Sequence, residues 1–238
     1  NGRNINDGCG STHPELLQKT VAAVEAAAGI ALDGDGDRVV MVDEHGEVID
    51  GDQILFVLAT ARKTEGALVG PVVGTVMSNL GLEHALQAHD IEFRRAAVGD
   101  RYVLEELRLT GGIIGGETSG HMICLDKTTT GDGLVTALQV LAIMKRTGQS
   151  LSALVGGMSR YPQTMVNVRT EERLDPGAHP AIQDAVSAVE EELAESGRVV
   201  LRASGTEPVI RVMVEGENEQ QVVTLAERLA SVVAEAAT

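Results

Sequence analysis

The residues best suited to chemistry form one short stretch, residues 33–38, which read Asp-Gly-Asp-Gly-Asp-Arg. Carboxylates this close together repel one another strongly unless a cation lies among them. The two glycines allow the backbone to turn tightly enough for the carboxylates to converge. Hard oxygen ligands of this kind suit Mg²⁺ or Ca²⁺. The sequence therefore predicts a divalent-metal site formed by Asp33, Asp35 and Asp37, with the positive charge of Arg38 beside it.

Two alternatives account for part of this acidic pattern. A solvated turn is common for Asp/Gly clusters, but it does not require so many aspartates between apolar segments. An EF-hand has ligands at loop positions one, three, five and twelve, and the three aspartates together with Glu44 have that spacing. The sixth position, which requires glycine, is Arg38, and the flanking residues 29–32 and 39–42 are typical of short buried strands. We therefore favour a metal loop at the end of a strand.

A second polar loop, residues 115–121, reads Gly-Gly-Glu-Thr-Ser-Gly-His and lies between two expected strands. Its glycines permit close approach of the backbone. Glu117 and Ser119 have side chains that can hydrogen-bond neighbouring hydroxyl groups of a ligand. His121 is able to transfer a proton near neutral pH. A glycine-rich turn with incidental polar residues is the alternative, and this loop by itself leaves both interpretations open.

A third loop follows Arg202 and reads Ala-Ser-Gly-Thr-Glu-Pro. Ser204 and Thr206 supply hydroxyl groups, and the backbone N–H groups around Gly205 are available to an anion. Arg202 and Arg211 flank the loop, and the planar fork of arginine binds two phosphate oxygens at once. This pattern predicts a phosphate cradle. A hairpin turn with surface arginines accounts for it equally well.

Two further polar segments each precede an expected helix. In residues 99–102, Asp100 suits the N-cap position, and Arg101 is either an exposed residue or part of a site. Lys127 begins a segment, residues 127–133, that is either a polar turn or one wall of a site.

The elements that position these loops alternate between helix and strand up to about residue 155, which is typical of an α/β fold with a parallel or mixed sheet. In such sheets, ligands bind beyond the strand ends. The last part has the different order of a small α+β domain. The first helix is expected to be capped by Thr12 and to bury one face formed by Leu16, Leu17, Val21 and Val24. We predict helices over residues 12–28, 53–62, 80–88, 102–109, 132–146, 151–155, 181–195 and 220–236. We predict strands over residues 30–32, 39–42, 47–49, 69–76, 91–97, 112–114, 122–125, 165–168, 199–202 and 210–215.

Composition limits the classes of partner. The 238 residues suffice for one large or two to three small domains, and the net charge of −16 argues against a nucleic-acid partner. That charge does not exclude a small anionic ligand held by local arginines. No apolar run is long enough to span a bilayer, so we expect no membrane partner. Cys9 and Cys124 lack metal-ligand spacing and are expected to be reduced thiols in a cytoplasmic protein.

Taken together, the three loops resemble those of the α-D-phosphohexomutase superfamily, and they occur in that family's order. Residues 4–12, 98–103, 127–133 and 204–215 are similar to the branch of the family that acts on glucosamine phosphates. The resemblance covers essentially the whole chain.

This resemblance implies an α/β fold in three parts. Residues 1–51 are expected to be the end of one three-layer α/β/α domain, residues 52–158 a complete second α/β/α domain, and residues 159–238 a C-terminal α+β domain. Members of the family have four domains and carry a phosphorylated serine, in a Ser-His-Asn context, in the first. No Ser-His-Asn occurs here. We therefore expect a C-terminal piece that lacks the first domain and part of the second, and that has no turnover alone.

The resemblance also implies roles for the candidate residues. The three aspartates are expected to hold Mg²⁺ together with an oxygen of the phosphoserine. Arg38 is expected to add positive charge, and Arg101 and His121 to handle protons or contact the substrate. The residues expected to bind the substrate are Glu117, Ser119, Lys127, Arg202, Ser204, Gly205, Thr206 and Arg211.

The implied activity is interconversion of glucosamine 6-phosphate and glucosamine 1-phosphate through the phosphoserine and a bisphosphate intermediate, leading to UDP-N-acetylglucosamine and peptidoglycan precursors. A phosphomannomutase/phosphoglucomutase is the alternative within this class. A non-catalytic module that binds a metal and a phosphosugar is the alternative from another class. The sequence leaves the oligomeric state open, a homodimer included.

Overall fold

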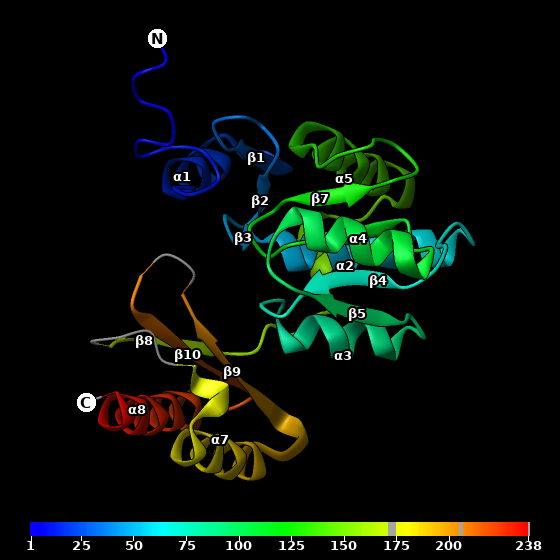
Figure 1. Ribbon diagram of the computed structural model, residues 1–238. Coiled ribbons are helices and arrows are strands. Elements are labelled where there is room, and N and C mark those ends of the chain that lie inside the picture. Colours follow the sequence, from blue (N-terminus) through cyan, green and yellow to red (C-terminus); the bar gives the residue numbers. More distant parts are fainter. Residues whose placement is uncertain (171–174, 205–206, 238) are drawn as a thin grey trace. The chain divides into compact units, whose positions relative to one another are not determined.

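The computed structural model describes residues 1–170, 175–204 and 207–237 (Figure 1). Two units are compact by themselves, residues 1–159 and residues 160–238. In the first unit, helices and strands alternate along the chain, in the order predicted from the sequence. The further division of this unit at residue 51 stays a prediction. No helix among the described residues combines the length and the apolar character needed to cross a membrane.

The acidic stretch closes a β-hairpin. The strands of this first sheet are β1 (Ala28–Leu32), β2 (Val39–Asp43) and β3 (Val48–Ile49), in the order β1-β2-β3. They are antiparallel, and Leu32 pairs with Val39, so residues 33–38 form the connection between β1 and β2. An EF-hand requires helices at these positions. The flanking strands exclude that alternative.

The first helix, α1 (Glu15–Val24), differs from the prediction in two ways. Its N-cap residue is Pro14, and no side chain caps it, so the predicted cap by Thr12 is wrong. Leu16 and Val24 are 65% and 66% exposed, whereas Val21 is buried. The predicted apolar face is therefore only partly covered, and among the described residues α1 packs mainly against β1 and β2.

A mixed four-stranded sheet forms the centre of the first unit. Its order is β5-β4-β6-β7; β4, β5 and β6 are parallel and β7 is antiparallel. The parallel strands therefore end at one edge of the sheet, and the loops that follow them lie at that edge. Gly115 and Gly116, predicted as loop, belong to β6, and a side chain on either would overlap Val73 or Met122. The strands are β4 (Val72–Thr75), β5 (Phe93–Ala96), β6 (Ile114–Gly116) and β7 (Met122–Cys124).

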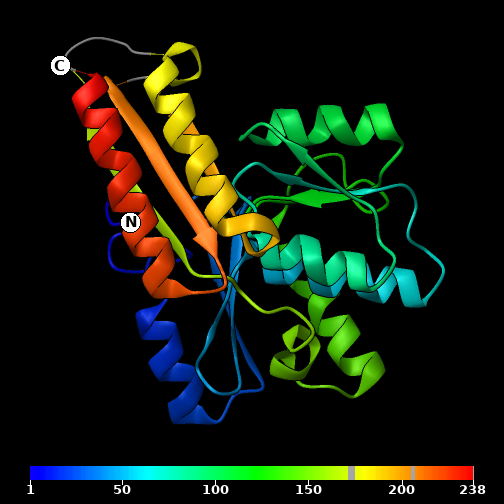
Figure 2. The same cartoon turned by 90° about the horizontal axis from the view of Figure 1, so that it is seen from below.

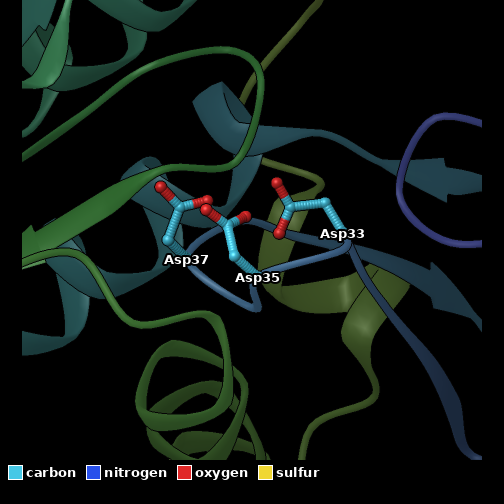
Figure 3. A group of neighbouring side chains, drawn as sticks. All are labelled: Asp33, Asp35 and Asp37. Atoms are coloured by element: carbon cyan, nitrogen blue, oxygen red, sulfur yellow. The ribbon is translucent and has the colours of Figure 1, made fainter. Parts of the chain in front are cut away.

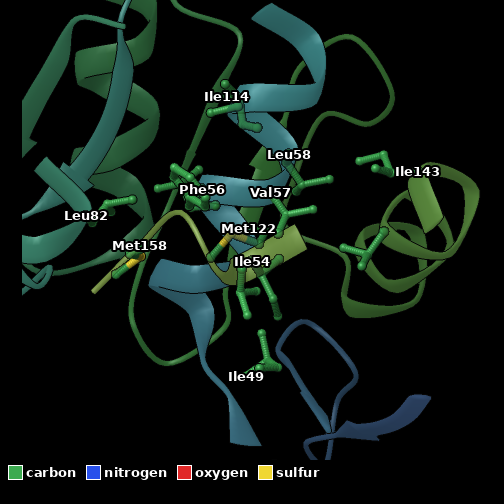
Figure 4. Packing of buried hydrophobic residues seen from close by; sticks show 14 of the residues in the cluster. Ile49, Ile54, Phe56, Val57, Leu58, Leu82, Ile114, Met122, Ile143 and Met158 are labelled. Atoms are coloured by element: carbon green, nitrogen blue, oxygen red, sulfur yellow. The ribbon is translucent and has the colours of Figure 1, made fainter. Parts of the chain in front are cut away.

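Helices cover both faces of this sheet, which gives three layers. On one face, α4 (Asp100–Thr110) buries Val103 and Leu107 against Val73 and Ile123. On the other, α2 provides Ile54, Phe56 and Leu58 to a large cluster that also includes β2 (Figure 4). The helices of this larger cluster are α2 (Gly51–Thr64), α3 (Leu80–Ala88), α5 (Gly133–Thr147) and α6 (Leu151–Val155).

The second unit is a small α+β fold. Its sheet has the order β8-β10-β9, and both pairs of strands are antiparallel. Two helices, α7 and α8, lie side by side and bury Ile182 and Leu225 against Val212 of the sheet (Figure 2). The elements are β8 (Gln163–Arg169), α7 (Pro180–Leu193), β9 (Gly197–Ala203), β10 (Val209–Gly216) and α8 (Glu219–Ala236), with 3₁₀ turns at Pro176–Ala178 and Ala194–Ser196.

Candidate active site

The acidic loop is closed by its own first carboxylate. Oδ1 of Asp33 accepts hydrogen bonds from the backbone N–H of Gly36 at 3.1 Å and of Arg38 at 3.2 Å. Gly36 has a φ of +77°, a conformation that costs glycine little. The loop is anchored on its other side, because the carbonyl of Gly36 accepts from the N–H of Gly133 at the start of α5. Its shape is therefore set by contacts within the protein.

The three predicted metal ligands do converge. One carboxylate oxygen from each of Asp33, Asp35 and Asp37 lies within 4.8 Å of the others, and the side chains stand on the same side of the loop (Figure 3). Arg38 offsets part of the charge, with contacts of 3.7 Å to Asp33 and 4.0 Å to Asp37. Oδ1 of Asp37 is buried and accepts no hydrogen bond from the described residues. Grouped carboxylates with one unsatisfied buried oxygen fit a hard divalent cation such as Mg²⁺.

The loop of residues 117–121 lies directly against the acidic loop. Arg38 and His121 form an isolated antiparallel β-bridge, and the N–H of Val39 donates to the carbonyl of Gly120 at 3.1 Å. His121 is only 4% exposed, and its Nδ1 lies 3.0 Å from Oδ2 of Asp37. Its Nε2 is buried against the backbone of Gly131, where a Cβ would be 2.1 Å away. The imidazole thus contacts a predicted metal ligand and is shielded from solvent.

Glu117 connects this loop to the segment before α4. Its Oε1 accepts from the backbone N–H of Gly99 at 2.9 Å, beside the N-terminus of that helix, where negative charge is favoured. Arg101 is exposed and lies over the ring of Tyr102, 4.7 Å from its centre. Ser119 is exposed as well. The structure therefore brings the segments that contain Glu117, Ser119 and Arg101 to one edge of the sheet.

Asp52, which the sequence did not single out, contacts the same loop. It is 1% exposed, and its Oδ2 accepts from the hydroxyl of Thr118 at 2.9 Å and from the N–H of Asn79 at 2.8 Å. Burial, and then the nearby charge of Asp50, raise its pKa to about 6, although the hydrogen bonds oppose that shift. An acidic residue in the first turn of a helix is common for dipole reasons alone, so no sequence signal distinguished it.

Lys127 lies elsewhere. Its ammonium group pairs with Asp126 at 3.2 Å, and Asp126 pairs with Arg62 in the last turn of α2. Thr118 contacts the first turn of that helix. Lys127 is therefore at the opposite end of α2 from the loop of residues 117–121, and the structure does not bring it to the other predicted site residues of the first unit.

The predicted phosphate cradle lies in the second unit. Arg202 and Arg211 occupy directly paired positions on β9 and β10, and neither forms an ion pair with the described residues. Ser204 follows β9, and its N–H donates to the carbonyl of Val209 at 2.7 Å. A cavity of about 160 Å³ is lined by Thr170, Ser204 and their neighbours. Gly205 and Thr206, also predicted for this cradle, are outside the described residues.

Comparison with known families agrees with this geometry. The family model described as phosphoglucomutase/phosphomannomutase, alpha/beta/alpha domain III, matches residues 50–161. The model for the C-terminal domain of the same family matches residues 165–232. The chain belongs to the phosphoglucomutase/phosphomannomutase family, the α-D-phosphohexomutases. The resemblance and the mixed α/β fold predicted from the sequence are confirmed.

Two curated relatives with high identity are both phosphoglucosamine mutases. The chain is 60% identical over 235 residues to a phosphoglucosamine mutase of Methylococcus capsulatus, covering 99% of this chain and 53% of the relative. It is 56% identical over 232 residues to a phosphoglucosamine mutase of Acinetobacter baumannii, covering 98% and 52%. The chain thus spans about half the length of the curated relatives that it matches.

Solved phosphohexomutase structures share the fold at low identity. An Aspergillus fumigatus N-acetylphosphoglucosamine mutase, solved in complex with GlcNAc-6P and magnesium, has a TM-score of 0.78 and 22% identity, covering 98% of this chain and 54% of that one. A phosphoglucomutase/phosphomannomutase family protein of Burkholderia thailandensis has a TM-score of 0.73, 23% identity and coverages of 94% and 51%. At this identity the likeness concerns the fold alone.

Proposed function

We propose that this chain is part of a longer cytoplasmic phosphoglucosamine mutase, which interconverts glucosamine 6-phosphate and glucosamine 1-phosphate. The observation that carries this proposal is the direct contact between the acidic loop and the loop of residues 117–121, through His121 and Asp37. A charge-neutralising group and a hydroxyl-binding loop are what phosphoryl transfer to and from a sugar requires. The choice of glucosamine is supported by the relatives at 60% and 56% identity.

In this proposal, Asp33, Asp35 and Asp37 hold Mg²⁺. When bound, Mg²⁺ supplies positive charge that stabilises a transferring phosphoryl group. Arg38 lies beside two of the aspartates, and its side chain is 47% exposed. Its guanidinium is therefore accessible to a bound phosphoryl group and adds a second positive charge in this proposal. His121 orients Asp37 in this proposal. Both of its ring nitrogens are turned away from solvent, which favours a positioning role over the proton transfer expected from the sequence.

The sugar is bound by Glu117 and Ser119 in this proposal. A carboxylate has about four positions that accept hydrogen bonds, and the N–H of Gly99 occupies one on Glu117, so others remain for sugar hydroxyls. Arg101 lies on the segment that Glu117 holds, and its exposed guanidinium is available to an anionic substrate. The same contacts serve both phosphate positions only if the sugar binds in two orientations, which is what a mutase needs.

The phosphate that does not react is bound in the second unit in this proposal, by Arg202, Arg211 and Ser204. Two guanidinium groups that form no ion pair with the described residues, at paired positions of neighbouring strands, repel each other, and a phosphate dianion between them relieves that repulsion. Each planar fork also offers two donors to the phosphate oxygens.

The test is an assay of the full-length protein with glucosamine, mannose and glucose phosphates, each in the presence of Mg²⁺. We expect kcat/KM for glucosamine 6-phosphate to exceed those for the other sugars at least about tenfold, the range that one or two polar contacts provide. A preference for mannose phosphate would identify a phosphomannomutase instead. The chain of 238 residues alone is expected to show no turnover, because the serine expected to carry the phosphoryl group is absent from it.

A further inference from the structure

We propose that Asp52 is a positioning residue of this site, which acts through Thr118 to hold the sugar-binding loop of residues 117–121 in the conformation that binds substrate. The effect on substrate binding rests on the proposed function. The hydrogen bonds of Asp52 that hold the loop are formed within the first unit and do not depend on it. Asp52 is buried, and none of its hydrogen-bond partners among the described residues belongs to the acidic loop, so it would act on the substrate only through the loop of residues 117–121.

One carboxylate oxygen joins three separate segments of the chain. Oδ2 of Asp52, in the first turn of α2, accepts from Thr118, 66 residues later, and from the N–H of Asn79, 27 residues later. Asn79 caps α3 and ends the turn that follows β4. Both partners therefore lie at the edge of the sheet where the parallel strands end, and an ionised acceptor makes both hydrogen bonds stronger than a neutral one would.

The backbone reinforces this attachment. The N–H of Gly51 donates to the carbonyl of Thr118 at 3.0 Å, so Thr118 is held at its side chain and at its backbone. A Cβ on Gly51 would lie 2.0 Å from the carbonyl oxygen of Glu117 and 2.7 Å from the N–H nitrogen of Gly120. The loop thus packs directly on the first turn of α2, and Thr118 forms its hydrogen bonds to that turn.

The consequence concerns the residues on either side of Thr118. Glu117 and Ser119 are the proposed sugar ligands. The side chain of Glu117 is bound to Gly99 and Ser119 is exposed, and Thr118 between them is the residue of this loop whose side chain is held by α2. Because the hydroxyl of Thr118 donates its one proton to Asp52, Thr118 cannot donate a hydrogen bond to the sugar. It sets the position of its two neighbours.

A buried carboxylate lowers the stability of the folded protein, so a purely structural role does not explain Asp52 well. Burial disfavours the ionised form of Asp52, and its pKa of about 6 reflects that cost. An amide in the same place would present one acceptor oxygen without a buried charge. The carboxylate is better explained by the strength with which it fixes the loop than by a contribution to stability.

The test compares Thr118→Val, which removes the hydroxyl at similar volume, with Thr118→Ser, which keeps it, in the full-length protein. Asp52→Ala is the third variant, and amide hydrogen exchange is measured on all of them in the absence of substrate. In Thr118→Val we expect the amides of Gly51 and Gly120 to exchange about tenfold faster, and that of Asn79 to be unchanged. In Asp52→Ala the amide of Asn79 should also exchange about tenfold faster, and Thr118→Ser should match the unmodified protein.

Kinetics with glucosamine 6-phosphate give the second readout. Thr118→Val is expected to raise KM about tenfold or more, because it removes the hydrogen bond between the loop and Asp52. Thr118→Ser keeps that hydroxyl, so its KM should stay within about twofold of the unmodified protein. Unchanged exchange in Thr118→Val and Asp52→Ala, or an unchanged KM despite faster exchange, would overturn the inference. If the unmodified protein turns over no hexosamine phosphate, the proposed function fails, and the exchange comparison still decides whether Asp52 holds the loop.

Discussion

The Nδ1 atom of His121 lies 3.0 Å from Oδ2 of Asp37, although the two residues are 84 positions apart in the chain. Asp37 is the last carboxylate of the acidic loop, and its other oxygen, Oδ1, is buried without a hydrogen bond from the described residues. One oxygen of this carboxylate is therefore held by the imidazole, while the other lies 4.0 Å from Nε of Arg38. Such contacts orient a metal ligand before the cation binds, and losing one typically lowers metal affinity about 10- to 100-fold.

Replacing His121 should therefore weaken metal binding more than folding. We expect His121→Ala to lower Mg²⁺ affinity about 10- to 100-fold, and His121→Asn, which keeps a donor near the position of Nδ1, to lower it less. Calorimetric titration of Mg²⁺ into each variant measures this. The matched control is His13→Ala, since His13 is an exposed histidine of the same unit. Equal Mg²⁺ affinity in His121→Ala and the control would show that the imidazole does not orient Asp37.

Asp52 should give the protein a pH dependence of stability of definite sign. Burial raises its pKa from 3.8 to about 6, so the folded state binds the proton more tightly than the unfolded state. Its stabilising contribution is full below pH 3.8 and is lost as the pH rises through about 6. The rise of this pKa from 3.8 to about 6 corresponds to about 3 kcal/mol of unfolding free energy.

The Asp52→Asn side chain cannot titrate, so this variant should lack the pH dependence of stability that Asp52 provides. The difference in unfolding free energy between the unmodified protein and Asp52→Asn should therefore change by roughly 2–2.5 kcal/mol between pH 4 and pH 7, with the variant gaining relative stability at the higher pH. The slowest-exchanging amides of β4, which report opening of the first unit, provide the measurement. A difference that stays constant over this range would mean that the carboxyl group ionises normally.

The acidic loop was predictable because all of its chemistry is local. Three aspartates, two glycines and two flanking apolar segments lie within a few residues, and the hairpin between β1 and β2 follows from them. The roles of Asp52 and Lys127 depend on tertiary contacts. Lys127 has a side chain that suits a phosphate-binding site, but it pairs with Asp126, which pairs with Arg62 at the far end of α2. Asp52 looks like an ordinary helix-start residue until Thr118 and Asn79 are brought to it.

The exposed side of α1 shows what apolar periodicity in the sequence cannot predict. Periodicity predicted a buried face with Leu16 and Val24, yet both are more than half exposed. A pattern of apolar residues shows which face of a helix suits burial, and it does not show whether a described element covers that face.

Removing one arginine of the predicted phosphate cradle should have opposite effects on binding and stability. Arg202→Ala should lower the affinity for glucosamine 6-phosphate about 10- to 100-fold in the full-length protein, because a charged, forked hydrogen bond is lost. Without ligand, the same variant should be as stable as the unmodified protein or more so, because like charges at paired strand positions cost roughly 0.2–1 kcal/mol.

Calorimetry and thermal unfolding, each with and without the sugar phosphate, separate these two effects. Arg228→Ala is the control, since Arg228 pairs with Glu192 on the exposed face of the helices. Unchanged affinity together with lower stability in Arg202→Ala would identify Arg202 as a packing residue of β9.

Two glycines with a positive φ allow the fit between the acidic loop and the loop of residues 117–121 to be tested. Gly120 has a φ of +94° and Gly111 a φ of +73°. A Cβ on Gly111 would meet nothing within 4 Å, whereas one on Gly120 would lie 2.0 Å from the carbonyl oxygen of Val39, which follows the acidic loop. Gly111→Ala should therefore cost only the conformational strain, about 1 kcal/mol. Gly120→Ala should cost more than about 3 kcal/mol, since the backbone itself must move.

Because that movement displaces His121, Gly120→Ala should also weaken Mg²⁺ binding, and Gly111→Ala should not. Exchange of the β4 amides and titration with Mg²⁺ measure the two quantities. Similar losses in both variants would mean that the two loops are not in the close contact on which the proposed site depends.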